Sequence, residues 1–204
     1  MRCKKFYDAK LAALALVFAV RSATMLGQGL LVDQATGPNL QSTALPIPDN
    51  QLVQSFTPSF SAVGFVQFAM AVLANPNVPS VTVLVNLRQN SYDGPVISST
   101  DPVVAMNRIT QVQTFYFPGN VPLTAEQVYF LEPVILSAGR MDIDDIGPST
   151  YVRGVLFNNG VPAGAGDLWF QEGIVVPEPS EVWLFLFGGA VLLWRLRVGR
   201  RSEI

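Results

Sequence analysis

The stretch VTVLVNLR, residues 81–88, has the clearest secondary-structure pattern in the chain. Its odd-numbered positions are Val, Val, Val and Leu, which share one face of an extended strand, and the opposite face is polar apart from Leu84. A period of two residues is typical of a β-strand that buries one face. We therefore predict a half-buried strand here.

Segments of similar character lie on both sides of this strand. Turn residues separate them, as in Pro118-Gly119-Asn120 and Asn158-Asn159-Gly160. The further predicted strands are 51–57, 63–72, 95–100, 110–117, 127–137, 151–157 and 168–175. Residues 62–74 also fit a helix, because they are rich in Ala, Met and Leu. About eight short strands without a convincing helix predict an all-β fold, a jelly-roll-like β-sandwich.

The composition excludes several classes of site. The chain has 204 residues, no histidine and one cysteine, Cys3, which removes catalytic sets that need His, zinc sites of His or Cys, haem, iron–sulfur clusters and any internal disulfide. Residues 30–176 contain eleven acids, four arginines and no lysine, a net charge of −7. Such a body cannot neutralise the phosphates of a nucleic acid, so we expect no nucleic-acid partner. Nothing in it indicates an enzyme.

The N-terminal residues 1–28 have the organisation of a secretory signal peptide. Arg2, Lys4 and Lys5 are followed by the apolar run LAALALVFAV at 11–20 and then by small residues. Ten apolar residues are too few to span a bilayer as a helix. We expect an N-terminal signal helix that is removed on export.

The C-terminal residues 176–204 combine three features in a fixed order. The tripeptide Pro177-Glu178-Pro179 precedes the uncharged run VWLFLFGGAVLLW at 182–194. The basic tail then contributes Arg195, Arg197, Arg200 and Arg201. The apolar run predicts a transmembrane helix at about 181–197, lengthened by snorkelling arginines, with the basic tail on the cytoplasmic side.

This order resembles the PEP-CTERM sorting signal of Gram-negative bacteria. The resemblance implies export by the general secretory machinery, anchoring in the inner membrane and recognition of Pro177, Glu178 and Pro179 by an exosortase. It also implies a cell-surface or extracellular-matrix destination in an exopolysaccharide-producing bacterium. The body segments QSFTPSFSAVGFVQF (54–68) and DLWFQEGI (167–174) resemble the β-sandwich often found ahead of such signals. The predicted organisation is a signal peptide (1–28), a β-sandwich domain (29–175) and a sorting signal (176–204).

Acidic residues supply the candidate metal site and an enzymatic alternative. Asp142, Asp144 and Asp145 form the densest acidic cluster, which fits either a structural calcium site or a solvated acidic turn. A pair among the three body glutamates would suit glycoside hydrolysis only if a cleft held them at the required separation. These residues are Glu126, Glu132 and Glu172. We expect no cofactor, and a structural calcium ion is the one exception that this cluster would allow.

Aromatic residues supply the candidate ligand site. Trp169, Tyr151, Tyr92 and Tyr129 would stack on sugar rings if they shared an exposed face, and would belong to the core if they did not. Two functions follow: an exported, non-catalytic surface or matrix protein, and alternatively a carbohydrate-binding jelly-roll module that holds exopolysaccharide. Exposure of these aromatic rings distinguishes the two.

Overall fold

The computed structural model describes residues 28–37, 43–73, 79–106, 109–147, 151–164 and 166–177. These residues form fourteen β-strands and turns, which confirms the all-β prediction. They include no helix long and apolar enough to cross a membrane. The predicted signal helix and transmembrane helix fall outside these ranges.

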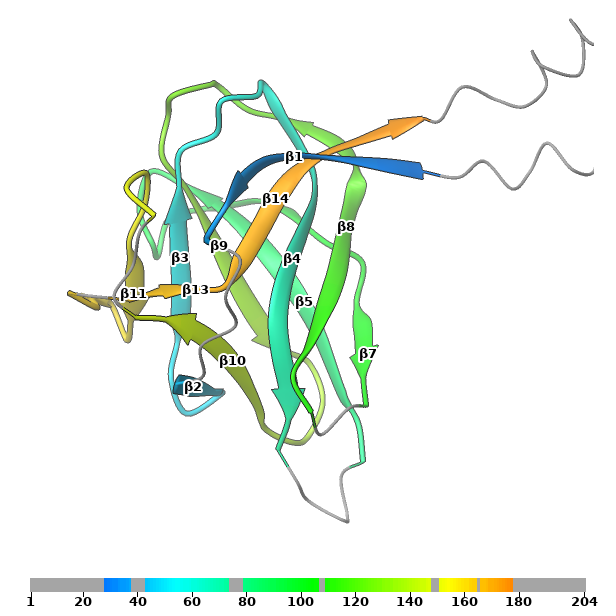
Figure 1. The fold of residues 1–204 in the computed structure, drawn as a ribbon, viewed down its shortest axis with the longest axis vertical. Coiled ribbons are helices and arrows are strands. Elements are labelled where there is room, and N and C mark those ends of the chain that lie inside the picture. The colour runs from blue at the N-terminus through cyan, green and yellow to red at the C-terminus, as the bar shows by residue number, and fades with distance from the viewer. Residues whose placement is uncertain are drawn as a thin grey trace, which may run out of the picture. The chain divides into compact units, whose positions relative to one another are not determined.

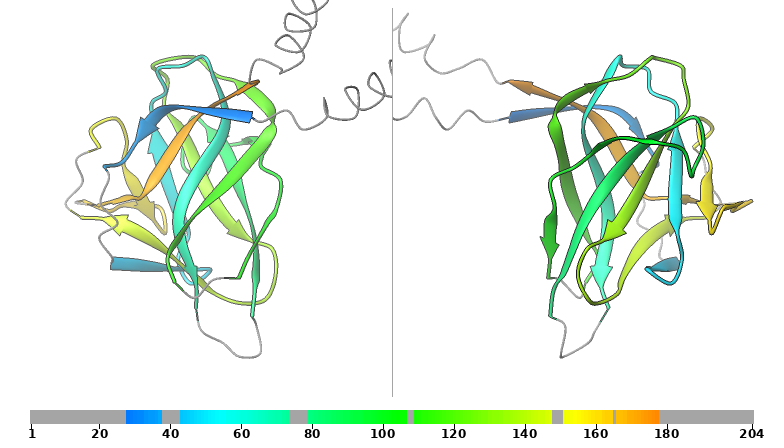
Figure 2. Two further views of the ribbon diagram at one scale, coloured as in Figure 1. Left: turned by 45° about the vertical axis from the view of Figure 1, so that its right-hand side comes forward. Right: turned by 180° about the vertical axis from the view of Figure 1, so that it is seen from behind.

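The strands belong to two antiparallel sheets, shown in Figures 1 and 2. The first sheet has the order β1-β14-β4-β10-β13, with β2 paired to β10 and β8 paired to β4. Its strands are β1 (Gln28–Ala35), β2 (Thr43–Ile47), β4 (Ala62–Val72), β8 (Gln111–Pro122), β10 (Met141–Ile146), β13 (Asp167–Leu168) and β14 (Phe170–Pro177).

The second sheet has the order β12-β11-β3-β9-β5-β6, and β7 also pairs with β5. Its strands are β3 (Leu52–Phe56), β5 (Val81–Gln89), β6 (Val96–Ser99), β7 (Val103–Ala105), β9 (Tyr129–Ile135), β11 (Leu156–Asn158) and β12 (Val161–Pro162). The compact unit that contains both sheets runs from Leu30 to Val175.

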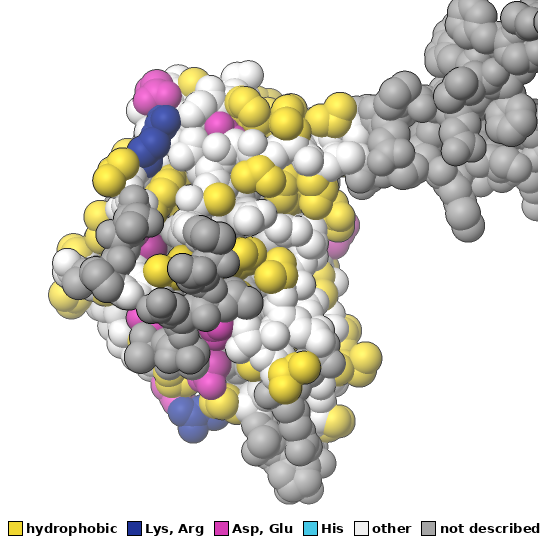
Figure 3. Space-filling model, in the orientation of Figure 1, with side chains coloured by type: hydrophobic (Ala, Val, Ile, Leu, Met, Phe, Trp, Pro, Cys, Tyr) yellow, Lys and Arg dark blue, Asp and Glu magenta, His cyan; other side chains and the backbone are white. Residues whose placement is uncertain are grey.

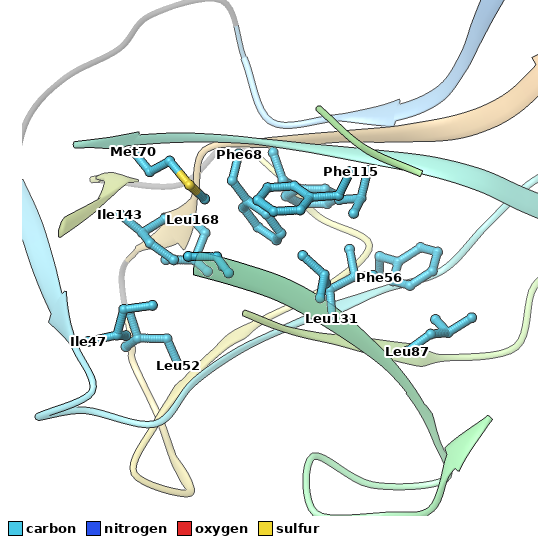
Figure 4. Close-up of a cluster of buried hydrophobic side chains, with 14 of the residues drawn as sticks. Ile47, Leu52, Phe56, Phe68, Met70, Leu87, Phe115, Leu131, Ile143 and Leu168 are labelled. Atoms are coloured by element: carbon cyan, nitrogen blue, oxygen red, sulfur yellow. The ribbon is translucent and has the colours of Figure 1, made fainter. Parts of the chain in front are cut away.

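One hydrophobic core lies between the two sheets, as in a β-sandwich (Figure 4). Phe68 of β4 is in contact distance of Phe115 of β8 and Phe170 of β14, with ring centroids 6.5 Å apart in each pair. From the second sheet, Leu131 of β9 and Leu87 of β5 are fully buried in the same cluster. Burial of these apolar side chains supplies the main driving force for folding.

The predicted strand 81–88 is β5, and its alternation is confirmed. Val81, Val83, Val85 and Leu87 are all completely buried, and the intervening residues are partly exposed. β5 pairs along its length with β9, from Val83 opposite Ile135 to Gln89 opposite Tyr129. One face of β5 therefore belongs to the core, as the period-two pattern predicts.

Residues 62–72, which also suited a helix, form the most widely paired strand of the first sheet. β4 pairs with β8 on one side, and with β14 and then β10 on the other. Most of its residues are buried on both faces. A strand covered on both faces has no alternating pattern, which is why its sequence is ambiguous.

Two differences from the predicted elements have clear physical causes. The acidic stretch 141–146 is strand β10 and not a loop, because Met141 and Ile143 alternate inward while Asp142 and Asp144 share the opposite face. Residues 151–155, predicted as strand, form no strand, and only Leu156–Asn158 pairs with β3.

The sequence pattern also does not predict four of the short strands. β2, β7, β12 and β13 have two to five residues each, too few to show a period. The eight predicted strands are therefore fewer than the fourteen found in the described part of the chain.

The two ends of the sandwich unit lie side by side. β1 is hydrogen-bonded to β14, and the Thr36 backbone N–H donates to the Phe170 carbonyl at 3.0 Å. The Leu31 carbonyl lies directly over Gly173. Residue numbers thus rise along β1 as they fall along β14, which makes the pair antiparallel and brings the start of β1 close to the end of β14 (Figure 1).

Candidate functional site

The predicted sorting motif begins where the described fold ends. Pro177 is the last residue of β14, and Glu178, Pro179 and the arginine tail lie outside the described residues. The residue two positions before Pro177, Val175, is held by Asn120 of β8. The Asn120 amide nitrogen donates to the Val175 carbonyl, and the Val175 N–H donates to the Asn120 amide oxygen, both at 3.0 Å. This side chain therefore pairs with β14 as a neighbouring strand would.

A bulge in β8 places Asn120 in that position. Val63 pairs with Val121 but Phe65 pairs with Tyr116, so four residues of β8 stand opposite Gly64. Gly119 in the bulge has a φ of 85°, a conformation that suits glycine. A side chain at residue 64 would collide with Asn120 and Val175. The predicted turn Pro118-Gly119-Asn120 is thus a bulge in β8. Its Asn120 side chain is hydrogen-bonded to the backbone near the end of β14.

Glu172 is a buried carboxylate in the same strand. Its exposed fraction is 0%, and neither carboxylate oxygen has a hydrogen-bond partner among the described residues. Phe170, two positions earlier, points into the core, so the alternation of β14 turns Glu172 to the same face. Burial without a partner strongly disfavours the charged form of a carboxyl group.

The surroundings of Glu172 reinforce this effect. Burial first, and then the negative charge of Asp33, raise its pKa, while the positive charge of Arg153 offsets part of the rise; together they bring the pKa to about 8. Burial likewise raises the pKa of the Tyr151 hydroxyl, whose ring packs edge-on against Phe170 with centroids 5.2 Å apart. The neutral form of Glu172 is therefore favoured at pH 7 in the folded protein.

Asp33 and Arg153, the charged residues near Glu172, both have other hydrogen-bond partners. The Asp33 carboxylate accepts hydrogen bonds from the backbone N–H groups of Ser59 at 2.6 Å and Phe60 at 2.8 Å. Arg153 donates to Ser59 Oγ at 3.0 Å and forms an ion pair with Glu126 at 2.7 Å. The charged groups around Glu172 are thus engaged elsewhere, which leaves it with no counter-ion of its own.

A buried hydrogen-bonded pair connects the two sheets. Gln54 of β3 donates to the Asp167 carboxylate of β13 at 2.8 Å and accepts from the Leu168 N–H at 2.8 Å. Burial raises the pKa of Asp167, and the hydrogen bond from Gln54 opposes that rise. The pair joins β3 and β13 by specific polar contacts, which is a structural role.

Glu132 has a different environment from Glu172. It lies in β9 and receives hydrogen bonds from Gln51 at 2.8 Å, Asn86 at 3.1 Å and Arg88 at 2.8 Å. Burial alone would raise its pKa, but these hydrogen bonds and the Arg88 charge outweigh burial and hold the pKa below 4.5. Glu126 is exposed and pairs with Arg153. Glu132 and Glu126 thus have separate partners, and Glu172 has none among the described residues. The structure does not join the three glutamates that we considered for glycoside hydrolysis in one set.

The aromatic candidates do not share an exposed face. Trp169 is 6% exposed and Tyr129 is 4% exposed, and Tyr129 belongs to the core beside Phe56. Tyr151 packs edge-on against Phe170. Tyr92 is partly exposed and stacks on Phe157 of β11, with ring centroids 5.4 Å apart. Tyr92 and Tyr151 are both partly exposed, but the Tyr151 hydroxyl oxygen is buried, which leaves Tyr92 as the better candidate for a ligand contact.

The acidic candidates lie on β10. Burial raises the pKa of Asp142 and of Asp144, and Asp144 accepts a hydrogen bond from Thr110 at 3.3 Å. Asp145 follows on the opposite face of the strand. In the part of the chain that the structure describes, no three acidic, His or Cys side chains are grouped to hold a metal ion. The calcium site stays a prediction.

Sequence reasoning missed Glu172 and Gln54 as buried polar groups. The signal for Glu172 was present, since Phe170, Glu172 and Ile174 occupy the same face of one strand. Comparison with known proteins adds no identification: no protein-family model matches the chain, and no curated protein matches it in sequence.

Proposed function

We propose that the chain is an exported, non-catalytic cell-surface or extracellular-matrix protein, with a jelly-roll sandwich delivered by a PEP-CTERM signal. The observation that carries this proposal is the order of three elements at the C-terminus: Pro177-Glu178-Pro179, the apolar run 182–194 and the arginine-rich tail. An exosortase and the secretion machinery are its partners, and the inner membrane is its first destination.

The fold supports this proposal through the position of its ends. The start of β1 and the end of β14 lie side by side, so that a removable N-terminal segment and a C-terminal sorting segment would join the domain at one place. Asn120 fastens β14 two residues before Pro177. Because β14 is held in this way, the motif that follows it would be presented to a processing enzyme at a defined distance from the folded domain.

Replacement of Pro177, Glu178 and Pro179 by alanine tests the sorting signal. We expect the variant to be exported but to remain in the cytoplasmic membrane at its full mature mass. The matched control is Ser180→Ala, which changes the adjacent residue and leaves the tripeptide intact. Trimmed, released product from the triple variant at the wild-type level would refute the sorting proposal.

The carbohydrate-binding alternative rests on one residue, Tyr92, in the turn between β5 and β6 of the second sheet. Tyr92 is partly exposed, and its partner Phe157 also contacts Phe130 of β9, two positions from the hydrogen-bonded set around Glu132. An aromatic ring beside polar groups is the arrangement that sugars require. If this alternative holds, wild-type protein is retained on immobilised exopolysaccharide and Tyr92→Ala is not. The control is Tyr116→Ala, which removes an exposed tyrosine of the other sheet. Equal retention of wild type and Tyr92→Ala would refute it.

A further inference from the structure

The start of β1 exposes three consecutive aliphatic side chains. Leu30 is 37% exposed, Leu31 48% and Val32 43%. Figure 3 shows apolar side chains gathered over β1 and the neighbouring β14. Ile174 and Val175 of β14, which adjoin them, are partly exposed and also aliphatic. We call residues 30–32 and 173–175 the terminal ribbon.

Both faces of the terminal ribbon are apolar. Successive side chains of a strand point to opposite faces, so Leu31 lies on one face and Leu30 and Val32 on the other. A protein that docks on the face of a sheet covers only one of these sets. A fluid apolar medium covers both at once.

The terminal ribbon also carries no exposed charge. Asp33, the first charged residue of β1, is held by the backbone N–H groups of Ser59 and Phe60. Glu172, the last charged residue before the ribbon in β14, is completely buried. Transfer of this edge into an apolar environment therefore desolvates few polar groups beyond the backbone.

The chain length brings a membrane within reach of this edge. Six residues, 176–181, separate Val175 from Val182, where the uncharged run begins. At about 3.3–3.6 Å per residue, the two positions are at most about 25 Å apart. We propose that the terminal ribbon rests on the lipid surface of the membrane that holds the C-terminal helix. This inference rests on the proposed membrane anchoring.

The depth of contact follows from the hydrogen bonding of β1. β1 is the last strand of its sheet in the described part of the chain, so the backbone N–H and C=O groups of its outer edge have no strand partner there. Such groups need water or headgroups as partners and cannot enter the hydrocarbon interior. The ribbon therefore stands edge-on at headgroup level, where its backbone edge finds polar partners and the aliphatic side chains of both faces lie in the interfacial layer.

Fluorescent labels on single cysteines test the contact. The chain is produced in a host without an exosortase, in a Cys3→Ser background, and reconstituted in vesicles of phosphatidylethanolamine and phosphatidylglycerol. An environment-sensitive label is placed at Leu31→Cys or, in a second variant, at Leu30→Cys. The control label is at Val161→Cys, an exposed aliphatic position of β12 at an edge of the other sheet. We expect blue-shifted emission and strong quenching by nitroxide-labelled lipids at residues 30 and 31, and neither at 161.

Each alternative result overturns the inference in a distinguishable way. If the chain resists carbonate extraction but the labels at 30 and 31 report water, anchoring holds and the lipid contact is refuted. If carbonate extracts the chain, both the anchor and the lipid contact are refuted. A blue shift that grows with protein concentration, without quenching by the lipid nitroxide, shows that a second copy covers β1 instead.

Discussion

Replacement of Glu172 by glutamine tests whether the folded protein holds the Glu172 carboxyl group in its protonated form. In the unfolded chain this carboxyl group titrates near its ordinary pKa of 4.5, and in the folded protein burial raises the pKa to about 8. Between these pH values the folded protein retains the proton and the unfolded chain has lost it. Unfolding then releases a proton, so the free energy of unfolding falls as the pH rises.

The size of the effect follows from these two values. Each pH unit between about 4.5 and 8 lowers the free energy of unfolding by about 1.4 kcal/mol, or about 5 kcal/mol over the whole interval. Glutamine has nearly the same shape but does not ionise. We therefore expect Glu172→Gln to match wild type within about 1 kcal/mol near pH 4.5 and to be several kcal/mol more stable at pH 9.

Urea denaturation of a fragment spanning residues 28–177, at several pH values from 4.5 to 9, measures this difference. Comparison with wild type cancels the titration of the other carboxylates. The control is Asp101→Asn, which makes the matching acid-to-amide replacement at an exposed position. If Glu172→Gln and wild type lose stability in parallel as the pH rises, Glu172 is ionised in the folded protein and our description of this edge is wrong.

Two further substitutions test other parts of the fold. Arg88→Ala removes the ion pair to Glu132, whose N–O distance is 2.7 Å, and should lower the free energy of unfolding by about 2–4 kcal/mol at neutral pH. These contacts lower the pKa of Glu132 from its ordinary value, so their contribution to stability is lost as the pH falls through the pKa of the folded state. The deficit measured by urea denaturation should therefore shrink in acid, and an unchanged deficit there would contradict the assignment. Asn120→Ala should cost about 1 kcal/mol and speed amide hydrogen exchange at Val175 but not at Phe170, whose N–H is bonded to Thr36. Unaltered exchange at Val175 would show that Asn120 does not fasten β14.

The sequence predicts those strands whose two faces differ in environment. β5 is such a strand, because one face packs in the core and the other is partly exposed. β4 is buried on both faces, and its ambiguity with a helix is resolved only by its pairing with β8, β14 and β10. Such pairing depends on residues far away in the chain, which a local pattern does not contain.

The prediction of a loop at the acidic stretch of β10 was wrong for a different reason. Met141-Asp142-Ile143-Asp144 does alternate, but the concentration of charge favoured a solvated loop. In the structure β2 pairs with this strand on its outer side, and Asp144 becomes almost fully buried. The burial of Trp169 and Tyr129 could likewise not be derived from spacing, because it depends on which segments cover each face.

The central claim of our account is that this domain is exported and processed at both ends. Mass spectrometry of the mature protein, purified from the cells that produce it, tests this claim most directly. The account predicts a species that lacks the N-terminal signal segment of about 28 residues and the C-terminal apolar run 182–194 with its arginine tail. A single species of 22.1 kDa that retains both terminal segments would contradict it.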